Sequence, residues 1–210
     1  MIQKKMLVIT GPQGSGNHMW SKIFALYPRT FGWKALLNEY WIGHDQEPFA
    51  EYWKDPTKLK DFDWNQSDYF VTSISVPYMN NGERTIPKFK EFIHAVEDLG
   101  IKIEFAIIGR DQNIVRMQET RVRGEPTVDI AIKELRNLSG RMPYFLSYEL
   151  LHLYQGDYLI QLNKILNFPV AHNDTRIDEI LKDDTNQKYF RPVEHHPTDD
   201  LARHTSRKWQ

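Results

Sequence analysis

The sequence predicts an α/β fold of three layers, α/β/α, in which helices cover both faces of a mainly parallel sheet. Segments of β-branched and apolar residues alternate along the chain with segments whose apolar residues recur at helical spacing. The chain has 210 residues, the size of one ordinary domain, and 40% of them are hydrophobic. This apolar content is enough to fill a single core, and it excludes a disordered chain.

The first predicted strand covers residues 6–10, an apolar and β-branched run that ends at Gly11 and Pro12. A helix is expected from about Asn17 to Tyr27, where apolar residues follow helical spacing. A glycine-rich turn connects the two segments. The chain therefore begins with a strand, a turn and a helix.

Two further strands are expected over Tyr69–Val76 and over residues 102–108, with a helix between them. Pro87 marks the first turn of this helix, an apolar stripe runs from Phe89 to Leu99, and Gly100 follows its end. A strand, a helix and a strand in this order form a βαβ unit, whose strands pair in parallel through a right-handed crossover.

Three elements complete the predicted fold. Residues 127–138 are expected to form a helix, Tyr144–Ser147 a short strand, and residues 157–166 a helix with Asp157 as its N-cap. Strands and helices thus alternate as far as residue 166.

Two segments interrupt the alternation. Residues 43–68 are rich in Trp and Pro and carry seven acids against three lysines, hence a net charge of −4. We expect an insertion here, either a lid over a site or a surface loop anchored by its aromatic residues. Residues 181–210 are mostly polar. Residues 1–180 are therefore predicted to form the domain and residues 181–210 a polar tail.

The composition excludes several classes of protein. Lys and Arg number 27 and Asp and Glu 28, a net charge of −1, so no general electrostatic field would hold the chain on nucleic acid. Its apolar runs are far shorter than the roughly 20 residues of a membrane span. Without cysteine, disulfides and thiolate catalysis are excluded. We expect a cytoplasmic protein with neither nucleic-acid nor membrane partners.

The segment from Gly11 to His18 has the composition of an anion-binding loop. It contains three glycines within six residues, follows a strand and opens a helix. Small residues let successive backbone N–H groups converge on an anion, and the helix N-terminus adds about half a positive charge. The alternative is a tight strand-to-helix turn that binds nothing.

The residues after the last glycine indicate which anion the loop binds. A nucleotide-binding loop of the Walker type needs Lys and then Ser or Thr at these positions, to reach the β- and γ-phosphates and to hold Mg²⁺. Here they are Asn17 and His18. A transferred sulfuryl group carries less negative charge than a phosphoryl group and needs no obligatory metal, so sulfuryl transfer fits this loop better. A kinase with a degenerate loop remains the alternative.

Arg110 is the arginine that we expect to bind a ligand. The segment from Gly109 to Arg123 holds four Arg and two acids and directly follows the predicted strand 102–108. The carboxyl end of a parallel strand faces the crevice where such sheets bind ligands, and the planar guanidinium suits a phosphate group. Asp111 is a candidate N-cap for the next helix, and the alternative for the other arginines is that they solvate a helix face.

Three segments of the chain follow one another in a distinctive order. Ser15-Gly16-Asn17-His18 lies between a strand and an aromatic-rich helix, Arg110 is followed eight residues later by Gln118, and Tyr148-Glu149 precedes a helical segment that ends in Leu-Asn-Phe-Pro-Val. In this order and spacing they resemble the P-loop sulfotransferase superfamily, whose members use 3′-phosphoadenosine 5′-phosphosulfate (PAPS).

The resemblance implies a PAPS-dependent sulfotransferase with the P-loop sulfotransferase fold. It implies that the loop residues hold the 5′-phosphosulfate and that Arg110 holds the 3′-phosphate, with Gln118 where the family has a serine. The cofactor-binding candidates are thus Gly14, Ser15, Gly16, Asn17, His18, Arg110 and Gln118.

Two departures from the family pattern concern catalysis. The basic residue that the family places before Ser-Gly is Gly14 here, and the catalytic His at the end of the second strand is Ser75. His18 and Lys22 are the candidates for the missing positive charge, and His44 is the candidate base, with Glu39 and Asp45 as alternatives. A non-catalytic nucleotide-binding module therefore also remains open.

The acceptor is not specified by any motif. We expect a small molecule or a carbohydrate, and the acidic segment 43–68 favours a cationic or neutral acceptor over a polyanion. The polar residues His195, His196, Asp199, Asp200 and His204 are expected to be a solvated tail and not a metal site, because their spacing fits no helical ligand pair with a third ligand. No metal is expected.

Overall fold

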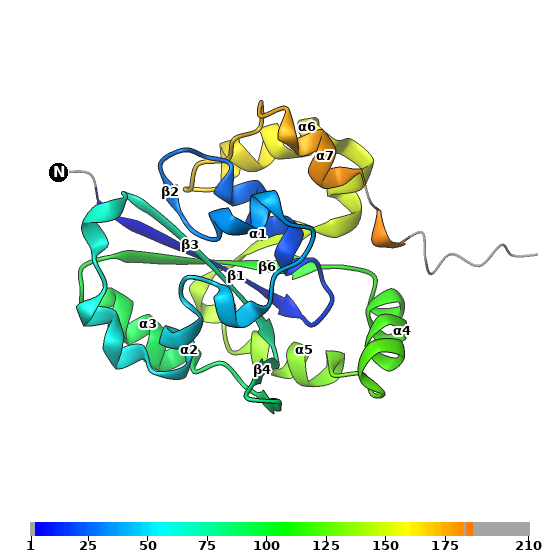
Figure 1. Cartoon of the computed structure of the whole chain (residues 1–210), viewed down its shortest axis with the longest axis horizontal. Helices are drawn as coiled ribbons and strands as arrows, with labels where there is room; N and C mark the ends of the chain where they lie inside the picture. The colour runs from blue at the N-terminus through cyan, green and yellow to red at the C-terminus, as the bar shows by residue number, and fades with distance from the viewer. Residues whose placement is uncertain (1–2, 183, 187–210) are drawn as a thin grey trace, which may run out of the picture.

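A computed structural model of the chain describes residues 3–182 and 184–186. Its centre is a five-stranded sheet in the order β2-β3-β1-β6-β7, and every pairing in this sheet is parallel (Figure 1). The strands are β1 (Lys5–Pro12), β2 (Thr30–Phe31), β3 (Tyr69–Val76), β6 (Lys102–Gly109) and β7 (Tyr144–Ser147). A separate antiparallel hairpin joins β4 (Tyr78–Asn80) and β5 (Glu83–Thr85).

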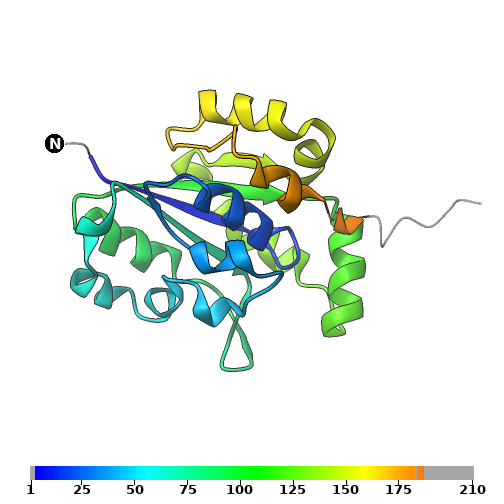
Figure 2. The ribbon, with the colours of Figure 1, turned by 45° about the horizontal axis from the view of Figure 1, so that its top comes forward.

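Helices cover both faces of the sheet, so the predicted three-layer α/β architecture is confirmed (Figure 2). On one face, α1 (Asn17–Ala25), α6 (Tyr148–Ile165) and α7 (Arg176–Leu181) pack on a core that includes Leu7 and Ile9 of β1. On the other, α2 (Ala50–Lys54), α3 (Phe89–Glu97) and α5 (Val128–Arg136) pack on Met6 and Val8. The central strand β1 is thus buried on both sides, as its unbroken apolar run requires.

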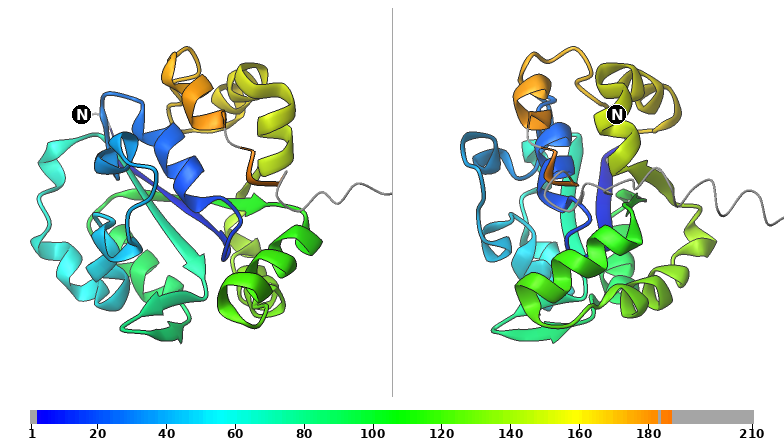
Figure 3. Two further views of the ribbon diagram at one scale, coloured as in Figure 1. Left: turned by 45° about the vertical axis from the view of Figure 1, so that its right-hand side comes forward. Right: turned by 90° about the vertical axis from the view of Figure 1, so that its right-hand side faces the viewer.

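The connections place the glycine loop where the chain changes direction across the sheet. The chain leaves β1 through α1 and returns to β2 on one side, whereas β3 is followed by α3 and β6 on the other side of β1. In open α/β sheets, ligands bind at such a switch point, outside the carboxyl ends of the strands. Helix α4 (Gln112–Arg123) stands beside this edge (Figure 3).

Most predicted elements lie close to their expected bounds. β3 and β7 have the predicted limits, β6 is one residue longer than predicted, and Gly100 ends the α3 turn with a φ of 72°. The prediction for Asp157 is wrong. Helix α6 begins at Tyr148, with the Ser147 side chain as its N-cap, and is interrupted by a positive φ of 45° at Gln155. The predicted helix is only the part of α6 after this interruption.

The acidic segment 43–68 is anchored by its aromatic residues, as one of the two alternatives expected, but it is built into the core of the domain. Its side chains Phe49, Trp53 and Leu59 are fully buried in the core under β3. The Trp53 ring stacks on Phe92 of α3, with ring centroids 3.8 Å apart and an interplanar angle of 8°. The segment, which contains α2 and the 3-10 helix η3 (Pro56–Asp61), is therefore part of a helical layer of the domain.

The predicted boundary at residue 180 falls inside the folded domain. Ile177 and Leu181 of α7 are buried, and so is Asn186. The domain therefore extends at least to Asn186, and residues 187–210 lie outside the described residues. Within the described ranges, no helix is both long enough and apolar enough to cross a bilayer.

Candidate functional site

The glycine loop leaves polar groups without protein partners at the N-terminus of α1. Gly14 and Gly16 have φ values of 80° and 111°, which other residues rarely adopt, and no side chain in the described part of the chain caps the helix. The Ser15 hydroxyl is buried without a hydrogen-bond partner among the described residues, and a Cβ atom at Gly11 would lie 2.6 Å from it. The first amides of α1 therefore remain available to an anion.

Asn17 ties this loop to the end of β3. Its Nδ2 donates a hydrogen bond of 2.7 Å to Oγ of Ser75, and its carbonyl accepts one from Ser21. The side chain that stands where a Walker loop has Lys is thus directed to the sheet. Ser75, at the end of β3, holds the loop in place.

Arg110 connects the loop to two other segments. Its Nη1 donates to the carbonyl of Gly14 and, at 2.9 Å, to Oε1 of Gln118, so the predicted pair of residues does meet beside the loop. Its Nε and Nη2 donate to Asn186 and Thr185. The guanidinium also lies over the ring of Tyr148, 4.4 Å from its centroid. This dense set of partners fixes the orientation of the cation.

A cavity of about 370 Å³ lies between the loop, Arg110 and the 3-10 segment around His44. It is lined by nearly all the residues predicted from the sequence: Gly14, Gly16, Asn17, His18, Lys22, His44, Arg110 and Gln118. Ser15 is the exception, because it lines a separate apolar cavity of about 520 Å³ beside Ile108 and Val115. We call the first of these the loop cavity.

His18 and His44 lie side by side at one wall of the loop cavity, with ring centroids 4.4 Å apart. Nε2 of His18 is 2.8 Å from the carbonyl oxygen of Ile42, and burial lowers its pKa. His44 is partly exposed to solvent. Desolvation by the surrounding protein is the main effect that lowers its pKa, to about 4, and the charges of His18 and Arg123 add to it. Both imidazoles are therefore neutral at pH 7.

Lys22 lies at the same wall, one turn along α1 from His18. Its Nζ donates a hydrogen bond of 2.7 Å to the backbone carbonyl of Glu39. Desolvation lowers the pKa of Lys22, and the charge of Glu39 partly opposes this. The Glu39 carboxylate itself is exposed and is not among the residues that line the cavity.

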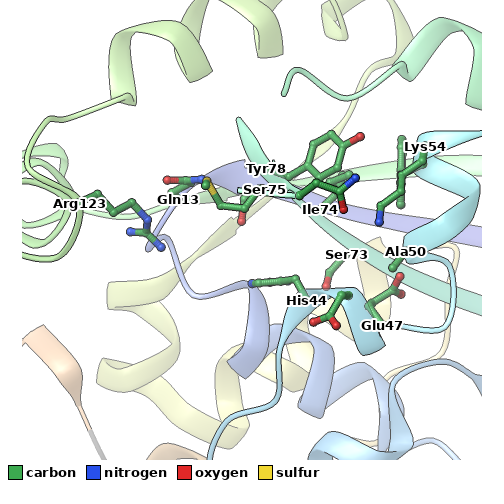
Figure 4. Close-up of a pocket in the computed structure, with 14 residues that line it drawn as sticks. Gln13, His44, Glu47, Ala50, Lys54, Ser73, Ile74, Ser75, Tyr78 and Arg123 are labelled. Carbon is green, nitrogen blue, oxygen red and sulfur yellow. The ribbon is translucent and has the colours of Figure 1, made fainter. Parts of the chain in front are cut away.

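A second cavity, of about 310 Å³, adjoins the first at the end of β3 (Figure 4). The two share His44, Ser75 and Arg123 as lining residues. We call this second space the β3 cavity, and it is lined further by Gln13, Asp45, Glu47, Ala50, Trp53, Lys54, Ser73, Ile74, Tyr78, Met79 and Asn81. A group bound at the loop and a group bound in the β3 cavity would therefore meet at these three shared residues.

Glu47 is the most perturbed group at the site. Its Oε2 accepts a hydrogen bond of 2.8 Å from the amide of Phe49, while Oε1 has no partner among the described residues. Burial raises the pKa of Glu47 to about 8. The nearby side chain of Thr72 and backbone of Ser73 partly oppose this rise, although neither makes a hydrogen bond of ordinary geometry to Oε1. With this pKa, Glu47 is protonated in most of the protein molecules at pH 7.

Sequence reasoning missed Glu47 and did not single out Arg123. Glu47 is one of seven acids in its segment, and no local pattern marks it as the buried one. Arg123 is one of four Arg near α4, and only the fold brings it to both cavities. Thr185 and Asn186 belong to a stretch that composition assigns to a polar tail. The one usable signal for Glu47 was the apolar Pro48-Phe49 that follows it.

The geometry defines an α/β protein with a glycine loop, an oriented arginine and two adjoining cavities at the carboxyl edge of its sheet. Comparison of the chain with protein-family models finds no match, and comparisons with curated proteins and with solved structures find none either. In the described part of the chain, no three His, Asp or Glu side chains gather as a metal ion would need. The five polar residues weighed as ligands between His195 and His204 lie outside that part.

Proposed function

We propose that the protein binds PAPS and transfers its sulfuryl group to a hydroxyl or an amine of a small-molecule or carbohydrate acceptor. The observation that carries this proposal is the pair of adjoining cavities, one at the glycine loop and one at the end of β3, which share His44, Ser75 and Arg123. A group-transfer enzyme needs its donor and acceptor to meet in this way.

The loop cavity suits the two anionic ends of the nucleotide. The amides at the N-terminus of α1 would bind the 5′-phosphosulfate, since none of the described side chains caps them. Arg110 would bind the 3′-phosphate, exchanging for it some of the hydrogen bonds that it makes to Gln118 and Thr185. Tyr148, which packs under Arg110, would keep the guanidinium in place during this exchange.

Transfer of the sulfuryl group forms a bond from sulfur to the acceptor atom and breaks the bond from sulfur to the bridging oxygen of the 5′-phosphate. The electron pair of the broken bond stays on the phosphate, and the proton of the acceptor passes to a base. His44 faces both cavities as a neutral imidazole and would take this proton. The products are the sulfated acceptor and adenosine 3′,5′-bisphosphate.

Arg123 would supply the positive charge that the loop lacks at Gly14. Its side chain has no hydrogen-bond or ion-pair partner among the described residues, and it lines both cavities. Desolvation is the main effect on Arg123 and lowers its pKa, yet an arginine stays charged at neutral pH. A cation at the junction stabilises the charge that develops on the leaving phosphate, and Lys22 and Arg110 are further cations at the loop cavity.

Titration calorimetry with adenosine 3′,5′-bisphosphate tests the nucleotide site. We expect one molecule to bind per chain, without a requirement for Mg²⁺, and Arg110→Ala to weaken binding while Arg116→Ala, at a residue that pairs with Asp129 away from both cavities, does not. Absence of binding at high micromolar ligand, or binding that is indifferent to Arg110→Ala, would overturn the proposal.

Two further measurements separate the alternatives. A kinase would be stabilised against heat by ATP with Mg²⁺ more than by adenosine 3′,5′-bisphosphate, and we expect the reverse. A non-catalytic module would bind the bisphosphate but would never transfer radiolabelled sulfate from PAPS to an acceptor mixture. Transfer of label that is lost in His44→Gln supports the assignment of the base.

A further inference from the structure

Three polar side chains of the β3 cavity are buried without a hydrogen-bond partner among the described residues. They are Oε1 of Gln13, Oε1 of Glu47 and Oγ of Ser73, and their residues are 3%, 4% and 5% exposed. Buried polar atoms are nearly always paired with protein, water or a ligand, so a group of three around one cavity needs an explanation. Their position at the end of β3, beside the loop, points to a ligand.

The chemistry of these atoms restricts the ligand. The amide oxygen of Gln13 accepts hydrogen bonds, an ionised Glu47 accepts them, and the Ser73 hydroxyl both accepts and donates. A partner for this set must be rich in donors, as hydroxyl and ammonium groups are. The cavity volume of about 310 Å³ lies at the lower end of the roughly 300–1,000 Å³ of small-molecule pockets.

We infer that the β3 cavity binds a small hydroxyl compound carrying an ammonium group, an amino alcohol or amino sugar, with the ammonium on Glu47 and a hydroxyl toward Ser75 and His44. The inference rests on the proposed function only where it names this compound as the acceptor. Binding of the compound in the β3 cavity does not depend on that function.

The charges around the cavity agree with this orientation. Figure 4 shows Arg123 and Glu47 at opposite ends, so a ligand cation next to Glu47 is kept away from the arginine at the junction. Lys54 also lines the cavity, but it is exposed to solvent and forms no ion pair with Glu47. An ammonium group is therefore the missing partner of the buried carboxyl, which ionises when the cation arrives.

Matched pairs of probes test the inference by titration calorimetry on the full chain. The pairs are ethanolamine with ethylene glycol and glucosamine with glucose, and glycolate serves as an anionic counterpart. We expect at least one amine to bind roughly tenfold or more tightly than its neutral partner, the range for a buried charge pair. At pH 7 its binding should release a proton, seen as different enthalpies in PIPES and MOPS buffers, because Glu47 is protonated in the free protein.

Variants locate the binding. Glu47→Gln should abolish both the preference for the amine and the proton release, whereas Glu51→Gln, an exposed acid of α2, should change neither. Ser73→Ala, which keeps Glu47, should weaken the amine and leave the proton release in place. If both amines bind no better than their neutral partners, if glycolate binds best, or if the preference persists in Glu47→Gln, the inference is overturned.

The outcome is separable from that of the proposed function. Failure of the amines with intact binding of adenosine 3′,5′-bisphosphate would overturn only the inference about the β3 cavity. Amine binding in a protein that does not bind the bisphosphate would instead overturn the sulfotransferase proposal and leave an amine-binding site.

Discussion

Arg110 donates a hydrogen bond from Nε to Oδ1 of Asn186 across 2.8 Å, although 76 residues separate the two in the chain. Both side chains are buried, and the same guanidinium holds the carbonyl of Gly14. One arginine thus joins the end of β6, the glycine loop and the last described residues. Its role in folding is therefore inseparable from its proposed role in binding.

Replacing Arg110 with Lys should destabilise the protein although the charge is kept. A lysine lacks the planar fork whose separate nitrogens reach Asn186 and Gly14, so we expect the free energy of unfolding to fall by about 1.5–3 kcal/mol, the usual range for hydrogen bonds to a charged group. Urea unfolding measures the change. Arg116→Lys, whose guanidinium pairs with Asp129 at the surface, is the control and should leave stability nearly unchanged. Equal stability of the two variants would contradict this role of Arg110.

The helix α4 and the helix α5 are joined by a buried carboxylate. Glu119 is fully buried and accepts hydrogen bonds from the amide and the hydroxyl of Thr127, at 2.6 and 2.5 Å. Glu119→Ala leaves both donors without a partner, which should lower the free energy of unfolding by about 1–3 kcal/mol. Denaturant unfolding is the measurement, with Glu91→Ala at an exposed position of α3 as control. A loss no larger than that of the control would show that Thr127 finds other partners.

The sequence was sufficient to predict the elements whose pattern is local. The strand Tyr69–Val76, the strand Tyr144–Ser147 and the glycine after α3 follow from β-branched runs, helical spacing and turn chemistry within a few residues of each position. The same local rules misplaced the start of α6. The interruption at Gln155 divides α6 into two helical parts, and the prediction took only the second part as the helix.

The parts of the site that sequence reasoning could not predict depend on contacts between distant residues. The loop and Arg110 were predicted because each follows a recognisable strand end, whereas Gln118 was predicted from the resemblance, as the residue eight positions after Arg110. Glu47 was not, because its burial depends on how residues 43–68 pack under β3, and an acid-rich segment ordinarily faces solvent. Asn186 reaches Arg110 only through the return of the chain after α7.

The pKa of His44 predicts how stability changes in acid. It lies at about 4 in the folded protein and at 6.5 in the reference state, so between these pH values the unfolded chain binds more protons and stability falls as the pH is lowered. His44→Gln should reduce the loss of unfolding free energy between pH 7 and pH 4.5, and the lowered pKa of His18 should account for part of what remains. Urea unfolding at the two pH values measures this. His94→Gln, exposed on α3, should keep the full loss, and an identical loss in all three proteins would contradict the lowered pKa of His44.

The proposed mechanism makes its sharpest demand on Arg123, the cation at the junction of the two cavities. If this guanidinium stabilises charge on the leaving phosphate, it acts mainly in the transition state, so Arg123→Gln should lower the turnover number by roughly 10²–10³-fold, the range for loss of one stabilising group. The Kd for adenosine 3′,5′-bisphosphate should change far less, because Arg110 and the loop amides carry ground-state binding. Sulfate transfer and calorimetry on the same variant measure the two quantities. Arg121→Gln, in the same last turn of α4 but outside both cavities, is the matched control. A parallel loss of affinity and turnover would make Arg123 a binding residue, and unchanged turnover would remove it from the mechanism.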